Sequence, residues 1–172
     1  MIDWPEIVRQ HAPLVWRTAY RLLAHDADAA DCLQETFVSA TEVAKRQEVH
    51  HWGGLLQRLA TVRAMDCLRR RMRERNHAMG RGDFDAVAAA EPGPLSAAQA
   101  TELSAHLRLA LAKLPPQQSE IFCLRQLNGL SYEEIAAELG ISADAVGVTL
   151  HRARATLRQL LESFAPCECK PR

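Results

Sequence analysis

Apolar residues recur along this chain at intervals of three and four positions, which is the period of an α-helix. One such run, near the carboxyl end, consists of Val146, Leu150, Ala153, Leu157 and Leu160. No segment shows the alternation of apolar and polar residues that predicts a β-strand, and no internal repeat stands out. Aromatic residues make up only 5% of a chain that is 48% hydrophobic, so the core has to be aliphatic. The pattern predicts an all-α protein.

Start and stop signals divide this pattern into separate helices. Asp3-Trp4-Pro5-Glu6 combines a capping acid with an early proline, and Asp26 can cap a second helix. Ser96-x-x-Gln99 and Ser131-x-x-Glu134 are capping-box patterns. We expect helices over about 4–24, 26–41 and 52–75, then from Ser96 to about 113, from Pro116 to about 127, from Ser131 to Gly140, and from Ser142 through Leu160.

The stretch from Asn76 to Ala97 differs in composition from the rest of the chain. Small and acidic residues are interspersed there with Gly80, Gly82, Pro92, Gly93 and Pro94. Stretches of this length and composition are typical of flexible linkers and are rare inside a compact domain. We therefore expect two small helical domains, one of three to four helices at 1–75 and one of four helices at 98–163, joined by a linker at 76–97 and followed by a tail at 164–172.

A short helix, a tight turn at Gly140 and a longer helix together predict a helix-turn-helix. Ile135 and Leu139 are spaced to pack on Val146 and Leu150, and a glycine can adopt the positive φ that the turn needs. The outer face of the second helix can then enter a DNA major groove. A plain helical hairpin has the same periodicity, however, and the motif alone does not distinguish one class of DNA-binding protein from another.

The charges of the chain cancel overall but are unevenly placed. A formal net charge of zero argues against a protein that coats polyanions. Residues 26–35 contain four acids and no base, whereas residues 58–75 contain seven arginines and two acids. Segregated patches of this kind suit a protein that meets nucleic acid on one face and a basic protein on another. Two solvated helix faces would give the same pattern.

The five cysteines do not predict a disulfide framework, because their number is odd and their spacing irregular. Cys32, Cys67 and Cys123 lie in apolar helical stretches and are interpreted as small buried residues. Cys167-x-Cys169 belongs either to a tail with reactive thiols or to a regulatory metal or redox site. Since no ligand pair of convincing spacing accompanies these two cysteines, they are weak metal candidates.

Nothing in the sequence is typical of an enzyme. Nucleophile constellations, phosphate-binding glycine loops and metalloprotease motifs are all missing. The first residues lack the basic region and long apolar run of a signal peptide, and no apolar stretch approaches the roughly 18 residues of a membrane span. We expect a cytoplasmic protein with no catalytic activity and no cofactor.

Several segments resemble those of extracytoplasmic-function sigma factors of the sigma-70 family. In the second half of the chain these segments are 114–122 (LPPQQSEIF), 129–136 (GLSYEEIA), 139–142 (LGIS) and 150–154 (LHRAR). In the first half they are 28–37 (DAADCLQETF) and 64–71 (AMDCLRRR). The resemblance covers about residues 4–162, in the same order and on both sides of the expected linker, which makes it far more specific than a shared helix-turn-helix.

The resemblance implies a role for each part of the chain. The second helix would dock on basic helices of the RNA polymerase clamp through Asp28, Asp31, Gln34 and Glu35. Residues 45–51 and the helix after them would meet the melted minus-ten strand, with cations from Arg58, Arg63, Arg69, Arg70 and Arg71. The second domain would bind the minus-thirty-five duplex through Asp144, Ala145, Val148, Thr149, His151, Arg152 and Arg154.

The chain also departs from the family pattern. Members often have basic or polar residues where this chain has Gly147, Val148 and Thr149, and Arg-Asn where it has Thr61 and Val62. The promoter sequence it prefers is therefore open. The implied partners are core RNA polymerase, promoter DNA and an anti-sigma factor, often a membrane-bound one, which would respond to stress or another signal.

Two other hypotheses remain open at this point. An autonomous helix-turn-helix repressor would need a dimer interface to pair its half-sites, and the acidic second helix would then have no assigned partner. An enzyme or a metal-sensing adaptor would rest on the cysteines alone. Co-purification with core polymerase separates the first of these from a sigma factor, and metal analysis of the purified protein tests the second.

Overall fold

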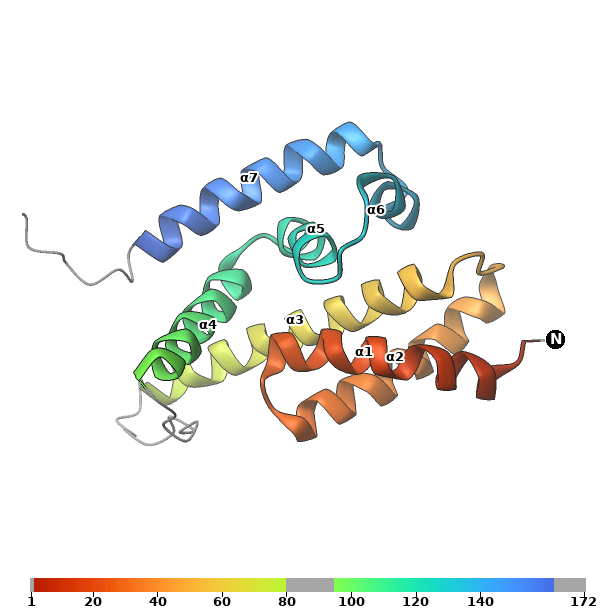
Figure 1. The fold of residues 1–172 in the computed structure, drawn as a ribbon, viewed down its shortest axis with the longest axis horizontal. Helices are drawn as coiled ribbons and strands as arrows, with labels where there is room; N and C mark the ends of the chain where they lie inside the picture. The colour runs from red at the N-terminus through yellow and green to blue at the C-terminus, as the bar shows by residue number, and fades with distance from the viewer. Residues whose placement is uncertain (1, 80–94, 163–172) are drawn as a thin grey trace, which may run out of the picture.

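The computed structural model describes residues 2–79 and 95–162. These residues form seven α-helices and no β-strand, which confirms the all-α prediction (Figure 1). The helices are α1 (Trp4–Leu23), α2 (Asp26–Arg46), α3 (Trp52–Met79), α4 (Leu95–Lys113), α5 (Pro116–Gln126), α6 (Tyr132–Leu139) and α7 (Ala143–Glu162). Most of the predicted linker, and the tail with Cys167 and Cys169, lie outside the described residues.

The first three helices pack against one another, and the starts of α1 and α2 follow from local capping. Asp3 caps α1 as predicted, since its carboxylate accepts a hydrogen bond of 3.1 Å from the backbone N–H of Glu6. The prediction that Asp26 caps α2 is wrong. His25 caps this helix, and its Nδ1 accepts a hydrogen bond from the backbone N–H of Asp28. Asp26 occupies the first turn instead, where a negative charge favours the helix dipole.

Two helices run further than predicted. α2 continues to Arg46 rather than ending near residue 41, because no glycine or proline interrupts it. α3 continues to Met79, since the first helix-breaking residue after it is Gly80. α4 begins at Leu95. The predicted linker is therefore helical at both of its ends.

The helix-turn-helix is held together by the local signals that the sequence contains. Ser131 accepts a hydrogen bond of 3.1 Å from the backbone N–H of Glu134, whose carboxylate accepts one of 2.7 Å in return, which confirms the capping box. Gly140 ends α6 with a φ of 64°, as predicted. Ile135 and Val146 are fully buried and join α6 to α7.

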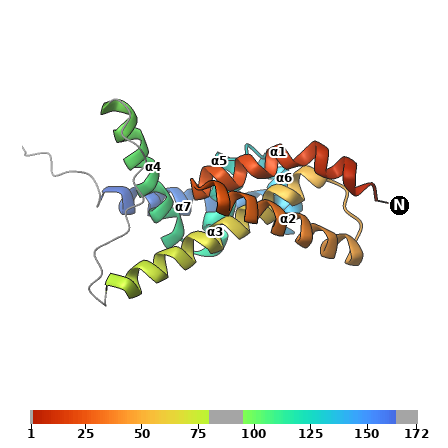
Figure 2. The same cartoon turned by 90° about the horizontal axis from the view of Figure 1, so that it is seen from below.

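The two halves of the chain pack together, an arrangement that the sequence left open. α5 and α6 lie along α3, and α4 crosses α3 closer to its C-terminal end (Figures 1 and 2). One buried cluster spans both halves. In it, Leu22 and Met65 from the first half join Leu111 and Leu114 from the second. The described part of the chain is therefore closed on itself.

Candidate nucleic-acid interface

The turn between α6 and α7 sets the position of the predicted recognition helix. The Ser142 hydroxyl accepts a hydrogen bond of 3.1 Å from the backbone N–H of Ala145 and so caps α7. The backbone N–H of Ile141 donates to the carbonyl of Ala136 at 3.1 Å, which closes the end of α6. These bonds, together with the buried contacts below them, fix the first turn of α7 relative to α6.

The residues predicted to contact duplex DNA lie mostly on the outer face of α7. The exposed ones are Asp144, Val148, His151, Arg152 and Arg154. Ala145 and Thr149 are partly covered. Val148 stands out because 51% of its surface is exposed, although it is a large apolar residue. The arrangement presents apolar, polar and cationic groups together on one face of a helix, and an α-helix fits into the major groove of DNA.

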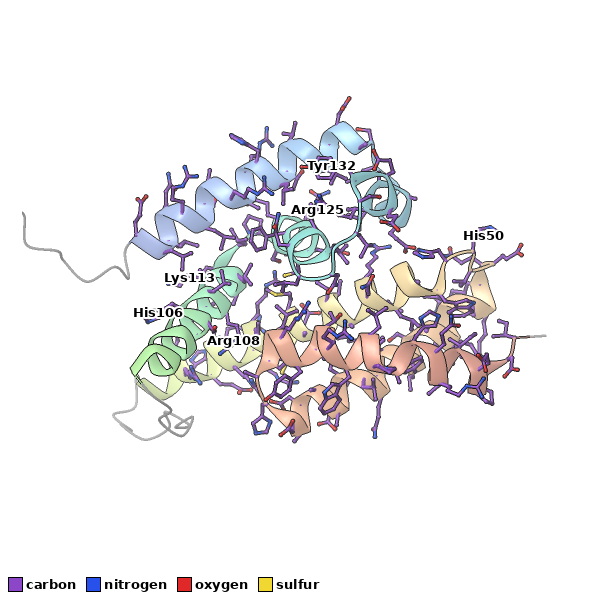
Figure 3. The ribbon with its side chains drawn as sticks, in the orientation of Figure 1. His50, His106, Arg108, Lys113, Arg125 and Tyr132 are labelled. Carbon is purple, nitrogen blue, oxygen red and sulfur yellow. The ribbon has the colours of Figure 1, made fainter. Side chains whose placement is uncertain are left out.

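The inner side of α7 rests on an aromatic ring that the sequence did not single out. A methyl group added at Gly147 would lie 3.5 Å from Cε2 of Tyr132. The Arg125 guanidinium lies over the same ring, 5.5 Å from its centroid (Figure 3). Arg125 also donates a hydrogen bond of 2.9 Å to the carbonyl of Leu130. This stack links α5, α6 and α7, and no local signal in the sequence indicates it.

Acids predicted to bind polymerase and arginines predicted to bind DNA face one another across α2 and α3. The Arg63 guanidinium lies 3.1 Å from the Glu35 carboxylate and donates a hydrogen bond of 2.7 Å to the Ser39 hydroxyl. Asp28 forms an ion pair with Arg71. The sequence suggested two separate charged faces, whereas the structure brings their edges into contact.

Two further predicted residues on these helices, Asp31 and Arg70, border an open hollow. Both are exposed, as is the uncharged side chain of Gln34. A cavity of about 500 Å³ lies between α2 and α3, with Asp31 and Arg70 among its lining residues. Its other lining residues include four further charged side chains that are predicted to serve the interface: Asp28, Glu35, Arg63 and Arg69. A wide, charged hollow suits a macromolecular partner better than a small apolar ligand.

Two of the predicted DNA-binding arginines point into the second half of the chain. Arg58 lies 3.0 Å from the Glu120 carboxylate through its Nε and donates a hydrogen bond of 2.6 Å to the carbonyl of Glu138. Arg69 donates a hydrogen bond of 2.7 Å to the Ser119 hydroxyl. In this closed form the two guanidinium groups are therefore engaged with α5 and α6.

Burial controls the titration of the groups inside the fold. It raises the pKa of the Cys32 thiol to about 11 and that of the Cys123 thiol to about 12. Both thiols therefore stay protonated at neutral pH, as expected of buried structural cysteines. Cys67 is only partly buried. Burial also raises the pKa of Glu138, although His51 and Arg58 act in the opposite direction.

The described residues offer neither a cluster of metal ligands nor a membrane-spanning helix. Within residues 2–79 and 95–162, no three histidines, cysteines or acids lie close enough together to hold a metal ion. Among the helices described there, none has an apolar stretch that would span a bilayer.

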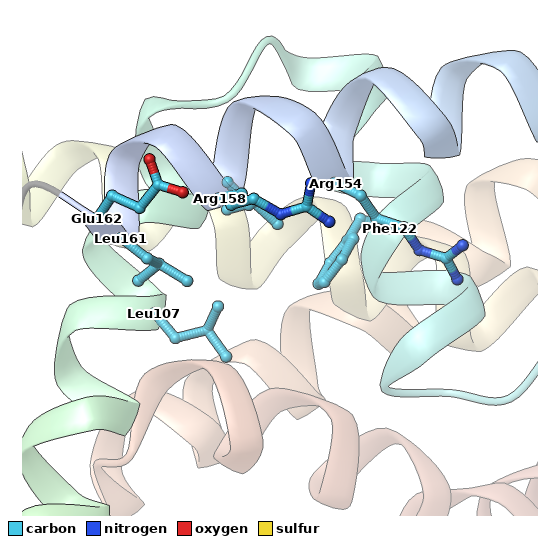
Figure 4. A pocket seen from close by; sticks show the side chains of 7 residues that line it. Leu107, Phe122, Arg154, Arg158, Leu161 and Glu162 are labelled. Atoms are coloured by element: carbon cyan, nitrogen blue, oxygen red, sulfur yellow. The ribbon is translucent and has the colours of Figure 1, made fainter. Parts of the chain in front are cut away.

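An apolar groove of about 480 Å³ lies at the C-terminal end of α7 (Figure 4). Leu107 of α4, Phe122 of α5 and Leu161 of α7 are among the apolar residues that line it. Arg154 and Arg158 line it as well. One of the predicted duplex-contacting arginines thus also borders an apolar surface.

Two family models match the chain, one on each half of the fold. The model described as Sigma-70 region 2 matches residues 7–74, which span most of α1 to α3. The model described as Sigma-70, region 4 matches residues 105–157, from α4 into α7. Both halves of the structure therefore match parts of the same family, in the order that the motifs predicted.

Individual sigma factors are similar to this chain over nearly its whole length. It is 40% identical over 161 residues to the ECF RNA polymerase sigma factor SigE of Mycolicibacterium smegmatis, a match that covers 94% of this chain and 62% of that protein. It is 33% identical over 157 residues to the RNA polymerase sigma factor CarQ of Myxococcus xanthus, covering 91% and 87%. The chain thus spans less than two thirds of the SigE relative.

A solved structure shows a related arrangement of the backbone. CnrH, in complex with the cytosolic domain of CnrY, aligns with a TM-score of 0.59 and 25% identity, over 92% of this chain and 87% of that one. The alignment includes both halves of the present structure.

Proposed function

Because the chain belongs to the extracytoplasmic-function group of the sigma-70 family, we propose that it directs core RNA polymerase to specific promoters at the start of transcription. The observation that carries the proposal is the joint match to region 2 on the first half and region 4 on the second. The relatives SigE and CarQ are both named as sigma factors, and each of them matches more than 90% of this chain. The proposed role is recognition within a larger enzyme, without a reaction of its own.

Polymerase docking is assigned to the acidic stretch of α2. Asp31 and Gln34 are exposed there and can meet a basic partner directly. Asp28 and Glu35 are paired with Arg71 and Arg63 across the α2–α3 contact. The Glu35–Arg63 pair is exposed, and exposed ion pairs contribute little to stability, so basic helices of the polymerase can replace Arg63 at small cost. The Asp28–Arg71 pair is partly covered, so its exchange costs more. The stretch thereby offers one exposed carboxylate, that of Asp31, and two carboxylates that can exchange an arginine of α3 for a basic group of the polymerase.

The melted minus-ten strand is assigned to α3 and to the segment before it. His50 lies at the tip of that segment, close to the start of α3 (Figure 3). Arg63 and Arg70 are exposed along α3 and can pair with backbone phosphates. Arg58 and Arg69 would join them only after leaving their partners on α5 and α6.

The minus-thirty-five duplex is assigned to the outer face of α7. Arg152 and Arg154 supply cations for the phosphates, and the exposed side chain of Val148 can contact a thymine methyl group. Apolar base contacts specify sequence with little gain in affinity. We therefore expect the isolated chain to bind DNA weakly, with most of the affinity supplied by polymerase.

An anti-sigma factor is the proposed regulatory partner. CnrH, which has a similar fold, was solved in complex with the cytosolic domain of CnrY. A corresponding inhibitor, membrane-bound or not, would act on this chain in the cytoplasm. No observation on the described residues favours an autonomous repressor.

Run-off transcription with purified core polymerase and a library of genomic promoters tests the proposal. We expect the full chain to support initiation at a small set of promoters, and we expect the isolated chain to give no sequence-specific shift of the same DNA. The matched control replaces Arg152 and Arg154 with alanine, which removes cations from α7 and leaves region 2 intact. Failure of the wild-type chain to bind core polymerase, with no inhibitor present, contradicts the proposed function.

A further inference from the structure

One polar side chain joins three helices where the two halves of the chain meet. The Asn128 amide, just after α5, donates a hydrogen bond of 3.1 Å to Thr61 Oγ1 of α3 through its nitrogen. Its oxygen accepts one of 3.0 Å from Thr18 Oγ1 of α1. Thr18 and Thr61 are 3% and 0% exposed, so each hydroxyl depends on partners inside the protein. Gln57 donates a weaker bond of 3.5 Å to the backbone carbonyl of Asn128.

Two charged contacts flank this amide on the same side of α3. Glu120 pairs with Arg58, and Ser119 accepts from Arg69 at 2.7 Å. Ser119 is 1% exposed, and the Glu120 side chain is 17% exposed. Hydrogen bonds to charged groups are the stronger ones inside proteins, especially where water is partly excluded. Asn128, Ser119 and Glu120, together with their partners on α1 and α3, are called the Asn128 latch below.

The apolar part of the interface cannot by itself specify how the halves meet. Leu22, Met65 and Leu111 are buried there, but contacts between aliphatic side chains are non-directional and tolerate sliding. Directional bonds at Asn128, Ser119 and Glu120 select one register of α5 on α3. Their donors on α3 include the guanidinium groups of Arg58 and Arg69, which cannot bind phosphate in the same geometry while they are engaged.

We propose that the Asn128 latch holds the free chain closed on itself and withholds Arg58 and Arg69 from nucleic acid until the chain opens. No second protein is needed for this closed state, because every bond in the latch lies within the chain. The inference rests on the proposed function only in assigning these two arginines to the melted strand. Opening exchanges the latch bonds for bonds to phosphate, so it is reversible and favoured by single-stranded nucleic acid.

A thiol already present in the chain reports the opening. Cys123 lies in α5, is fully buried, and belongs to the cluster shared by both halves. Cys32 is buried in the same cluster, but it lies between α2 and α3, where its Sγ contacts the carbonyl of Ala60 within the first half. Alkylation of Cys123 therefore follows separation of the halves, whereas alkylation of Cys32 follows unfolding of the first half. Mass spectrometry of the alkylated peptides separates the two rates.

The test variant combines Asn128→Ala, Ser119→Ala and Glu120→Gln in the full chain, and none of these residues is assigned to polymerase or DNA. Each lost bond shifts the closed–open equilibrium by roughly fivefold to tenfold. We expect alkylation of Cys123 to accelerate on the order of a hundredfold and that of Cys32 to stay unchanged. The matched control is Gln117→Ala with Gln126→Ala, two exposed positions on α5, which should leave both rates unchanged.

A single substitution on the opposite side provides an independent measurement if the triple variant folds poorly. Thr18→Val keeps the shape of the side chain but removes the donor to Asn128 Oδ1. We expect it to accelerate the alkylation of Cys123 by roughly fivefold. An unchanged Cys123 rate in both variants, or an equal rise at Cys32 and Cys123, overturns the latch.

The second readout is binding to a labelled single strand of about 20 nucleotides, measured by fluorescence anisotropy without polymerase. The triple variant should bind at least roughly tenfold more tightly than the wild type at low salt. Adding Arg58→Ala and Arg69→Ala to it should remove this gain. A gain that survives these changes, or no gain despite faster Cys123 labelling, overturns the claim that the latch withholds the arginines. Failure of the proposed function shows separately, as absence of transcription by the wild-type chain with core polymerase.

Discussion

The arginines of α7 and those of α3 have the same chemistry and the same proposed class of partner, yet their surroundings differ. Arg152 and Arg154 are exposed on a helix whose outer face meets solvent. Arg58 and Arg69 are held by bonds of 2.6 to 3.0 Å to groups on α5 and α6. An exposed cation can steer an encounter with DNA at once, whereas an engaged cation first has to lose its partner.

The position of each helix in the fold explains this difference. α3 contacts α1, α2, α4, α5 and α6, so a long side chain on almost any of its faces reaches another helix (Figure 2). α7 packs mainly on α4, α5 and α6, and keeps one face open. A count of arginines along the sequence therefore overestimates how many are available for DNA in the closed chain.

The largest expected effect is on promoter binding by the polymerase-bound chain after replacement of Arg152 and Arg154 with alanine. Each arginine removed should lower the salt dependence of binding by about one counterion, and the two together should weaken binding at least about tenfold. Anisotropy titrations of a promoter duplex over a series of salt concentrations measure both quantities. Wild-type affinity in this variant would show that the open face of α7 does not contact the duplex.

The next effect concerns folding stability and should be specific to α3. Arg58→Ala removes the partner of Glu120 and a donor to the carbonyl of Glu138, so we expect it to lower the free energy of unfolding by about 1–3 kcal/mol. Arg152→Ala, at an exposed position, should change it by less than about 0.5 kcal/mol. Chemical denaturation of the two variants gives the comparison. Equal free energies of unfolding for the two variants would show that the contacts of Arg58 with α5 and α6 do not stabilise the fold.

A smaller gain in stability is expected inside the recognition helix. Gly147→Ala should stabilise the chain by about 0.5–1 kcal/mol, because glycine is a poor helix former. The added methyl group would lie at an ordinary contact distance of 3.5 Å from Tyr132. Thermal unfolding measures the change. A lower melting temperature would indicate that the Arg125–Tyr132 stack leaves no room at this position.

The smallest effect is a dependence of stability on pH that comes from Glu138. Burial raises the pKa of this carboxyl above its ordinary value of 4.5. The folded chain therefore binds the proton more tightly than the unfolded chain, and the favourable contribution is complete below pH 4.5 and lost as the pH rises through the raised pKa. Glu138→Gln removes this titration. The difference in unfolding free energy between variant and wild type should grow from mildly acidic to neutral pH, and a constant difference would contradict it.

Local signals allowed most helices to be predicted. Ser131 and Glu134 specify the start of α6 within four residues, and Gly140 specifies its end, so no distant contact is needed to identify them. The same reasoning assigned the cap of α2 to Asp26, where His25 takes that role. It also ended α2 and α3 too early, because polar composition resembles a loop even where the residues are good helix formers.

The candidate site was only partly predictable for the same reason. The candidate residues on α2, α3 and α7 were found from sequence, and their assignment to polymerase or DNA remains a proposal. The sequence did not indicate the ion pairs of Glu35 with Arg63 and of Arg58 with Glu120. It did not indicate the cation–π contact of Arg125 with the ring of Tyr132 either. Each of these pairs joins different helices, and their spacing along the chain has no fixed relation to their distance in space.

The sequence alone determined that this chain forms amphipathic helices with a helix-turn-helix near its end. Periodicity, caps and the turn glycine suffice for this because they act over a few neighbouring residues. Only the tertiary structure decided that α5 and α6 would rest on α3 and occupy Arg58 and Arg69. That choice depends on Thr18, Thr61 and Asn128 meeting across 110 and 67 residues of chain. Hydrogen bonds of this kind form only where the packing of whole helices has already brought their partners together.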